Sequence, residues 1–415
     1  MNQQPPSESG RAARLLAAVS IALSAAFLLA GYEFLRSASQ SLYIGAYGAK
    51  NLPVAMALAP VGTLLFIWGY GWLLSVAGAA RATVLTCLAA AAAMVACHAA
   101  MTAGSRLAVG LLYVLRESYI VLLVEQIWAF INSTLREREG RRLNGPICGV
   151  ASLGAIGGGL AVQAWVRSVG SVNLVLFGAL SLLPTALGAM AAYRAAGEPE
   201  PAPDEAHGRQ GHLGLRVLWR DPLLRVLALV VIASQVVSTV FDLQLSRFVE
   251  TALPVADERT RWFGSFYVGL NVGSALFLFV VAPLLLAVAP LRLVHTVIPL
   301  THVTLAVTAL VCPSLRSAAA ALAVFKVLDY SVFRAAKELL YVPLSFDARY
   351  RAKALIDAFG YRFAKGGASA ILAVAGRVAA IPVAALAAVA ALASGVWLAL
   401  VPGLRRRPHA GSGHG

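Results

Sequence analysis

Apolar residues fill this chain in long runs, and short polar stretches separate one run from the next. Runs of about 18 or more apolar residues are typical of membrane-spanning helices, because a helix of about 20 residues crosses the hydrocarbon core of a bilayer. The pattern predicts twelve spans, near residues 14–36, 52–76, 80–101, 107–131, 146–168, 172–194, 223–247, 262–289, 291–312, 317–342, 353–375 and 380–403. The predicted fold class is therefore an all-α polytopic membrane protein with twelve transmembrane helices.

The predicted spans fall into two groups of six. The interval 195–221 is polar and proline-rich, which is typical of a flexible connector. It separates an N-terminal six-helix bundle (1–194) from a C-terminal six-helix bundle (222–404), after which a short tail (405–415) follows. Two six-helix bundles around a central connector are typical of major facilitator transporters.

Composition and charge narrow the class of protein further. Hydrophobic residues make up 59% of the chain and charged residues only 13%, whereas a soluble protein is about a quarter charged. The net charge of +15 comes largely from short basic loops, such as Arg136–Arg142, Arg349–Lys353 and Arg405–Arg407. By the positive-inside rule, these loops and both termini are expected on the cytoplasmic side of the cell inner membrane. The lipid bilayer is the expected partner and a nucleic acid is not, because no stacking aromatics accompany the basic residues.

Catalytic and metal-binding patterns do not stand out. The four cysteines, Cys87, Cys97, Cys148 and Cys312, have no paired spacing, and the seven histidines are scattered. The glycine-rich segment Gly154–Gly159 lacks the Gly-Lys-Ser/Thr ending of a phosphate-binding loop. We therefore expect no enzyme, no catalytic residue, no metal site and no cofactor, and we expect a monomer.

Ionisable residues inside the first and fourth spans are candidate functional residues, because each costs at least a few kcal/mol in a bilayer core. Glu33 and Arg36 are three residues apart and share a helix face, so they either neutralise each other or line a cavity. The fourth span carries Arg116, Glu117 and Glu125. Its acids indicate proton or cation coupling, and the alternative is an ion pair with Arg116 inside the bundle.

The second half of the chain carries more such residues. Asp242 lies on a polar face of the seventh span whose spacing of three and four predicts an inward orientation; the face comprises Gln235, Ser238, Thr239, Asp242 and Ser246. Basic groups in a low-dielectric cavity attract anions strongly. The tenth and eleventh spans therefore offer candidates for anion binding: Lys337, Asp357, Arg362 and Lys365. The alternative is an internal ion-pair network that only stiffens this half.

The residues of these spans resemble the ATP/ADP translocases of plastids and intracellular bacteria, which are nucleotide transporters of the major facilitator type. The similarity is most specific over Lys337–Leu344, Arg351–Asp357 and Arg362–Gly367. It also covers five earlier segments, Tyr32–Arg36, Gly45–Pro53, Gln126–Asn132, Arg138–Arg142 and Ser152–Gly158.

The resemblance implies roles for individual residues. In that family a lysine in helix one, acids in helices four and seven, and a lysine in helix eleven are tied to nucleotide transport. The resemblance places the helix-seven acid on Asp242, the helix-eleven lysine on Lys365 and the helix-four acid at Arg116 or Glu117. The helix-one lysine falls on Ser39 and is therefore missing, and Arg36, one turn away, is a candidate substitute.

The sequence thus predicts a secondary transporter that resembles ATP:ADP antiporters and moves a nucleotide or a related anionic metabolite by alternating access. The expected substrate-binding residues are Arg36, Lys337, Asp357, Arg362 and Lys365. The expected coupling or gating residues are Glu117, Glu125 and Asp242. Two alternatives stay open: a major facilitator transporter of a different, non-nucleotide solute, and a non-transporting membrane partner or receptor with the same fold.

Overall fold

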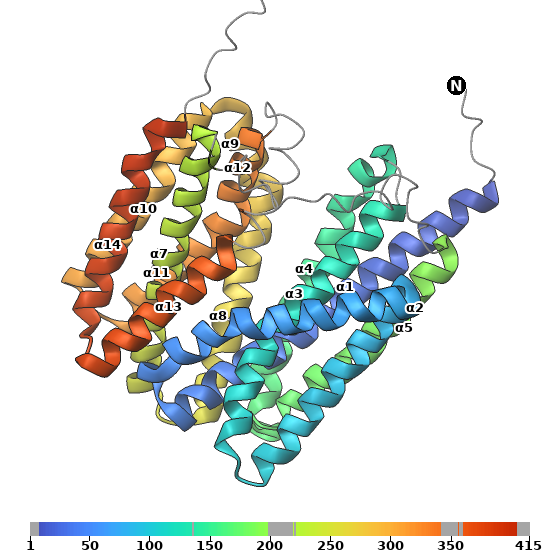
Figure 1. Cartoon of the computed structure of the whole chain (residues 1–415), viewed down its shortest axis with the longest axis horizontal. Coiled ribbons are helices and arrows are strands. Elements are labelled where there is room, and N and C mark those ends of the chain that lie inside the picture. Colours follow the sequence, from blue (N-terminus) through green and yellow to red (C-terminus); the bar gives the residue numbers. More distant parts are fainter. Residues whose placement is uncertain are drawn as a thin grey trace, which may run out of the picture. The chain divides into compact units, whose positions relative to one another are not determined.

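The computed structural model describes residues 8–134, 137–197, 219, 221–341, 356 and 360–404, and every regular element in these ranges is a helix (Figure 1). The first half contains α1 (Glu8–Tyr47), η1 (Ala49–Asn51), α2 (Leu52–Thr102), α3 (Arg106–Thr134), α4 (Glu137–Val169) and α5 (Leu174–Ala196). The second half contains α7 (Pro222–Ala252), α8 (Ala256–Leu276), η3 (Phe277–Val281), α9 (Ala282–Val288), α10 (Leu291–Val311), α11 (Leu315–Leu328), η4 (Asp329–Phe333), α12 (Arg334–Tyr341), α13 (Tyr361–Val378), α14 (Val383–Leu400) and η7 (Val401–Leu404).

Within the described ranges, nine helices are long and apolar enough to cross a membrane. The predicted all-α membrane class is confirmed, while the number of twelve spans stays a prediction. Helix α2 contains two predicted spans, and it is interrupted between them at Gly78, whose φ of 79° and ψ of 169° are not helical. Glycine suits that position, because a side chain disfavours positive φ. The described parts of the tenth and eleventh predicted spans carry charges, such as Lys326 and Lys365, that lower their hydropathy.

The chain forms two compact units. Unit 1 comprises Met1–Ala206 and Glu250–Ala275, and unit 2 comprises His207–Val249 and Leu276–Gly415. The predicted central connector lies mostly outside the described residues, so the predicted domain limits stay a prediction.

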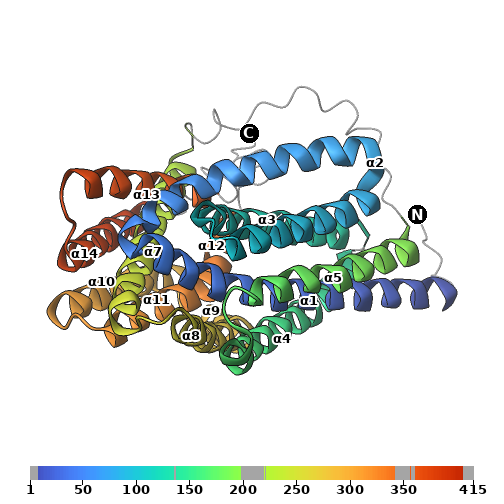
Figure 2. The same ribbon diagram turned by 90° about the horizontal axis from the view of Figure 1, so that it is seen from below.

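In unit 1, α1 packs against α3, α4 and α5, and α2 packs against α3 and α5 (Figure 2). Glycines of α4 allow the close approach to α1. A Cβ atom on Gly154 would lie 2.6 Å from Cα of Ala26, and one on Gly158 would lie 2.7 Å from Cα of Ala30. These contacts set the rotation of α1 and so decide which of its polar side chains meet α3 and α8.

In unit 2, α10 packs against α11 and α14. An aromatic cluster joins them, with ring centroids 4.9 Å apart for Phe333 and Trp397 and 5.5 Å apart for His302 and Trp397. The five-residue π-helical segment η4 connects α11 to α12 within the tenth predicted span. Such segments are frequent at functional sites, because they rotate the side chains that follow.

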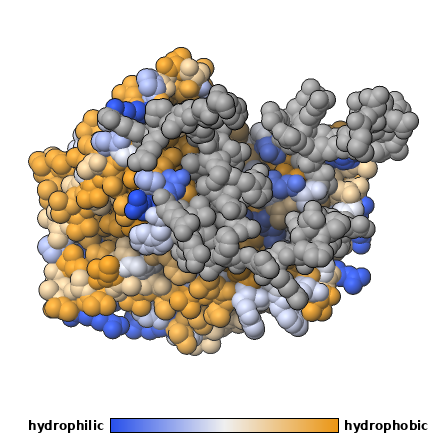
Figure 3. Space-filling model, turned by 45° about the horizontal axis from the view of Figure 1, so that its top comes forward, coloured by the Kyte–Doolittle hydropathy of each residue, from blue (hydrophilic) through white to orange (hydrophobic). Residues whose placement is uncertain are grey.

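Large apolar side chains are exposed over the surface of both units, among them Trp68, Leu187, Val288 and Val378. Figure 3 shows broad apolar areas on the face that it displays. A soluble monomer rarely exposes apolar patches of this extent. Contact with lipid acyl chains explains them.

Candidate functional site

Unit 1 brings charges of α1 and α3 together. Nη1 of Arg36 lies 3.6 Å from Oε1 of Glu33, so the two side chains form the ion pair that was one of the two alternatives for their spacing. Glu33 is buried, with 2% of its surface exposed, and the side chain of Arg36 is 14% exposed. The guanidinium of Arg36 also stacks 3.6 Å above the ring of Tyr267.

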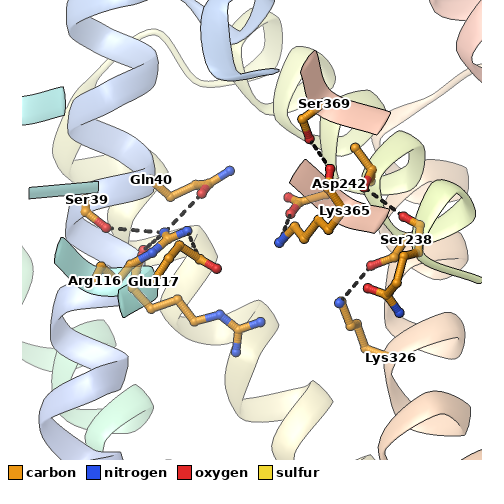
Figure 4. A network of polar contacts seen from close by, with 12 residues as sticks. Ser39, Gln40, Arg116, Glu117, Ser238, Asp242, Lys326, Lys365 and Ser369 are labelled. Carbon is orange, nitrogen blue, oxygen red and sulfur yellow. Dashed lines mark hydrogen bonds and ion pairs between the residues drawn. The ribbon is translucent and has the colours of Figure 1, made fainter. Parts of the chain in front are cut away.

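Arg116 of α3 is the centre of this group of contacts. Its Nη1 donates to the backbone oxygen of Arg36 at 3.2 Å, to Oγ of Ser39 at 3.2 Å and to Oε1 of Gln40 at 3.1 Å. Its Nη2 donates to Oε1 of Glu117 at 2.5 Å. Figure 4 shows the guanidinium between Ser39, Gln40 and Glu117. A buried charge is stable when it is paired and hydrogen-bonded, and Arg116 meets both conditions.

We call Glu33, Arg36, Arg116 and Glu117 the unit 1 cluster. It contains two positive and two negative side chains, so the formal charge of these four residues is zero. The cation at Ser39 comes from Arg116 of α3, and α1 itself supplies none at that position. At the position where the resemblance expects a lysine of helix one, the positive charge therefore comes from a neighbouring helix.

Two residues of α8 complete the cluster, and sequence reasoning missed both. Asn271 donates from Nδ2 to Oε1 of Glu33 at 2.9 Å, and Tyr267 lies under Arg36. They are four residues apart and therefore share one face of α8. The sequence signal that could have identified them is a polar residue, Asn271, one turn after a tyrosine, Tyr267, inside an apolar span.

Glu125 does not join the unit 1 cluster. It is exposed on α3, whereas Glu117 faces Arg116 and its side chain is only 24% exposed. Eight residues rotate an α-helix by about 80° beyond two full turns. Glu117 and Glu125 are eight residues apart, so they point in different directions around α3 and do not meet at one site.

In unit 2, α7 presents the predicted polar face inward. Gln235, Ser238, Thr239 and Ser246 are all buried. Asp242 is partly accessible, and its Oδ2 lies 3.9 Å from Nζ of Lys365. The structure thus brings together the two residues to which the resemblance assigned the helix-seven acid and the helix-eleven lysine (Figure 4).

Lys326 of α11 lies against the same face of α7. Its Nζ donates to Oγ of Ser238 at 2.9 Å, one turn before Asp242. The ammonium also lies 5.4 Å from the ring centroid of Tyr330. This contact joins two helices that are far apart in the sequence, so it depends on how they pack.

The other predicted anion-binding residues differ in their exposure. Lys337 is only 3% exposed, and its Nζ lies 3.4 Å from the hydroxyl of Tyr361 and 4.7 Å from the centroid of that ring. Arg362 and Lys365 on α13 are partly accessible. Asp357 lies outside the described residues.

Basic side chains outnumber acidic ones in one part of unit 2. The described residues from 326 to 365 include five basic and two acidic side chains: Lys326, Asp329, Arg334, Lys337, Glu338, Arg362 and Lys365. Among the described residues, no group of three His, Cys, Asp or Glu side chains could hold a metal ion. The excess of positive charge in an apolar surrounding favours an anionic ligand, because Coulomb attraction grows as the dielectric constant falls.

The second half of the chain matches a known family of transporters. Residues 214–407 match the family model described as TLC ATP/ADP transporter, which confirms the resemblance over the second half of the chain. No curated protein sequence matches the chain.

Solved transporter structures share the fold. An auto-inhibited peptide transporter of the POT family superposes with a TM-score of 0.68 at 13% identity, over 95% of this chain and 98% of that one. A mutant of the nucleoside transporter NupG gives a TM-score of 0.66 at 12% identity, over 94% and 98% of the two chains. A bacterial homologue of the iron transporter ferroportin gives 0.65 at 15% identity, over 94% and 99%.

At 12–15% identity, the likeness to solved structures shows the fold alone. The similarity in sequence to a transporter family comes from the family model. The chain is therefore a multi-pass membrane transporter of the major facilitator fold, whose residues 214–407 carry the sequence pattern of the TLC ATP/ADP transporter family.

Proposed function

We propose that this protein is a secondary transporter that moves a nucleotide or a related anionic metabolite across the inner membrane by alternating access, as ATP:ADP antiporters do. The observation that carries the proposal is the pair of Lys365 and Asp242. Their charged atoms lie 3.9 Å apart, and their side chains are 23% and 19% exposed. An ammonium group at this exposure is accessible to a phosphate oxygen, and a carboxylate beside it holds it in place until the anion arrives.

The remaining predicted residues take roles that follow from their exposure. Arg362 is partly accessible on α13 and is proposed to bind the anion together with Lys365. Lys337 is buried, so it acts on the anion through its charge. Asp357 keeps its proposed place in the substrate site from the resemblance alone.

Roles in unit 1 follow from its contacts. Arg36 offers a guanidinium to the substrate, and Glu117 couples or gates through Arg116. Asp242 couples or gates through Lys365 in unit 2. Glu125 is exposed and keeps only a gating role in the proposal.

A second candidate function is transport of a different, less charged solute within the same fold. The zero formal charge of the unit 1 cluster favours it, because that cluster attracts a highly charged nucleotide less than an excess of cations would. A panel of competing solutes distinguishes the two: excess unlabelled sugar or peptide should leave labelled ADP uptake unchanged when a nucleotide is the substrate.

Orientation and assembly complete the proposal. We infer that both termini lie in the cytoplasm. The basic predicted loops lie on the same side of the membrane as the termini, and basic loops are typically cytoplasmic. We also infer that a monomer is the working form, because two six-helix bundles suffice for a major facilitator transporter.

The test is uptake of radiolabelled ADP and ATP into proteoliposomes that contain the purified protein. The wild type should accumulate at least one of them, and Lys365→Ala should reduce uptake about tenfold or more, because a hydrogen bond to a charged group contributes about 1.5–3 kcal/mol. Arg377→Ala is the matched control, since Arg377 is an exposed cation in the last turn of the same helix. Uptake equal to that of empty vesicles across ATP, ADP, AMP and GTP would overturn the proposal.

A further inference from the structure

Two lysines of unit 2 contact the same face of α7 at successive turns. Nζ of Lys326 on α11 donates to Oγ of Ser238 at 2.9 Å, and Nζ of Lys365 on α13 lies 3.9 Å from Oδ2 of Asp242. Ser238 and Asp242 are four residues apart, so they share one face of α7 and lie about 6 Å apart along its axis. Figure 4 shows both ammonium groups on this side of α7. Two cations from different helices therefore follow each other along the polar face of α7.

The ammonium group of Lys326 is held by several contacts. Its hydrogen-bond partner Ser238 is fully buried, and the ring centroids of Phe325 and Tyr330 lie 5.6 Å and 5.4 Å from Nζ. Aromatic rings attract a cation that lies over their faces. Tyr330 belongs to the π-helical segment η4, which begins three residues after Lys326. An ammonium group that is already positioned loses little freedom when it binds an anion, so Lys326 is suited to a binding role.

Both lysines can be reached by a ligand. The side chain of Lys365 is 23% exposed, and Lys326 is partly exposed as well. An ammonium group carries three N–H donors, so an anion can join Ser238 at Lys326, or Asp242 at Lys365, without displacing them. The contacts with α7 therefore position the two cations and are compatible with a bound anion at each.

An ion pair within the helix is the alternative role for Lys326. Asp329 lies three residues later and is buried, and residues three apart share a helix face. That pair and the contact with Ser238 are compatible, because one ammonium group can serve several acceptors. A lysine with a purely structural role would affect the stability of the protein and not its choice of ligand, and this difference can be measured.

We propose that Lys326 is a further substrate-binding residue, which binds a second anionic group of the substrate next to the one at Lys365. A substrate with two adjacent phosphate groups then meets one ammonium group per phosphate along α7, whereas a substrate with one phosphate is bound at Lys365. Lys326 therefore determines how strongly the site prefers two anionic groups over one, and Ser238 is its positioning residue. The inference rests on the proposed function for the substrate, and it adds to that site a residue that reads the number of anionic groups.

The test measures the dissociation constants of ADP and AMP for the purified protein by isothermal titration calorimetry. The wild type should bind ADP about tenfold more tightly than AMP, which is the factor that one additional charge-assisted hydrogen bond supplies. Lys326→Gln should weaken the binding of ADP by about this factor and leave that of AMP unchanged, so that the two affinities become similar. Lys365→Gln should weaken the binding of both ligands.

Two further variants control for stability and for charge. Ser238→Ala removes the hydroxyl that positions Lys326, and it should weaken ADP binding about threefold without affecting AMP. Alanine is the best helix former, so this variant carries the test if Lys326→Gln does not fold. Arg316→Gln removes an exposed cation from the first turn of α11 and should leave both affinities at the wild-type values. A wild-type ratio of ADP to AMP affinity in the folded variants at Lys326 and Ser238 would overturn the inference.

Inorganic pyrophosphate and inorganic phosphate separate this inference from the proposed function. They offer two phosphate groups and one without a nucleoside. If the wild type prefers pyrophosphate, Lys326→Gln abolishes the preference and no nucleotide is transported, the proposed function fails and the role of Lys326 stands. If ADP is transported and Lys326→Gln keeps the wild-type ratio of ADP to AMP affinity, the proposed function stands and the role of Lys326 fails. Both fail if the wild type binds neither ADP nor pyrophosphate.

Discussion

The guanidinium of Arg116 on α3 donates a hydrogen bond to the hydroxyl of Ser39 on α1 over 3.2 Å. Ser39 is the position at which the resembled family carries a lysine, and it is fully buried here. Arg116 therefore supplies a positive charge to a place where the α1 side chain supplies none. The contact joins α1 and α3 within unit 1, and in unit 2 Asp242 lies beside Lys365.

If Arg116 supplies this charge, a second cation at Ser39 should not be tolerated. Ser39→Lys places two like charges in a buried site and should lower the free energy of unfolding by about 3 kcal/mol, because an uncompensated buried charge costs that much. Adding Arg116→Gln should restore most of the loss. Melting temperatures in detergent for both single variants and the double variant measure this, and losses that simply add would contradict the relationship.

Helix α4 should tolerate a methyl group at some glycines and not at others. Gly158→Ala would bring a Cβ atom to 2.7 Å from Cα of Ala30, so the two helix backbones must separate. Overpacking of this kind costs about 1–3 kcal/mol. Gly157→Ala is the matched control, because its Cβ meets nothing within 4 Å. The melting temperature should fall for Gly158→Ala only, and equal effects of the two changes would refute this account of the α1–α4 contact.

His302 should be replaceable by a larger apolar ring. It is fully buried in α10 between Phe325 and Trp397, and neither ring nitrogen has a hydrogen-bond partner among the described residues. His302→Phe removes two buried polar atoms and keeps the ring contacts, so it should leave stability unchanged or raise it by about 1 kcal/mol. His302→Ala opens a cavity and should cost about 2–4 kcal/mol. A large loss for His302→Phe, seen as a lower melting temperature, would indicate that a nitrogen serves as a donor or acceptor.

Two lysines of unit 2 should separate into a structural and a binding role. Lys337 is 3% exposed and packs on Tyr361, whereas the side chain of Lys365 is 23% exposed. Lys337→Met should therefore lower the melting temperature more than it weakens ADP binding. Lys365→Met should weaken binding about tenfold or more with a smaller change in melting temperature, because its partner Asp242 remains accessible to water. If Lys337→Met mainly weakened binding and Lys365→Met mainly lowered the melting temperature, exposure would not decide these two roles.

The amino-acid sequence by itself determined the features that depend on neighbours along one helix. Hydropathy placed the helices, because the length of an apolar run and the thickness of a bilayer are directly related. Spacing predicted the pair of Glu33 with Arg36 and the inward polar face of α7, because residues three and four apart share a helix face. The family resemblance pointed to Asp242 and Lys365, whose side chains lie side by side in the structure.

Only the tertiary structure decided which helices exchange polar contacts. Arg116 meets Ser39 from 77 residues away, and Asn271 meets Glu33 from 238 residues away. Neither pairing follows from periodicity, because it depends on how far each helix is rotated and how closely it approaches its neighbour. Small residues such as Gly154 and Gly158 set that rotation through contacts with the backbone of α1. The surroundings of Glu33 therefore follow only from the packed unit.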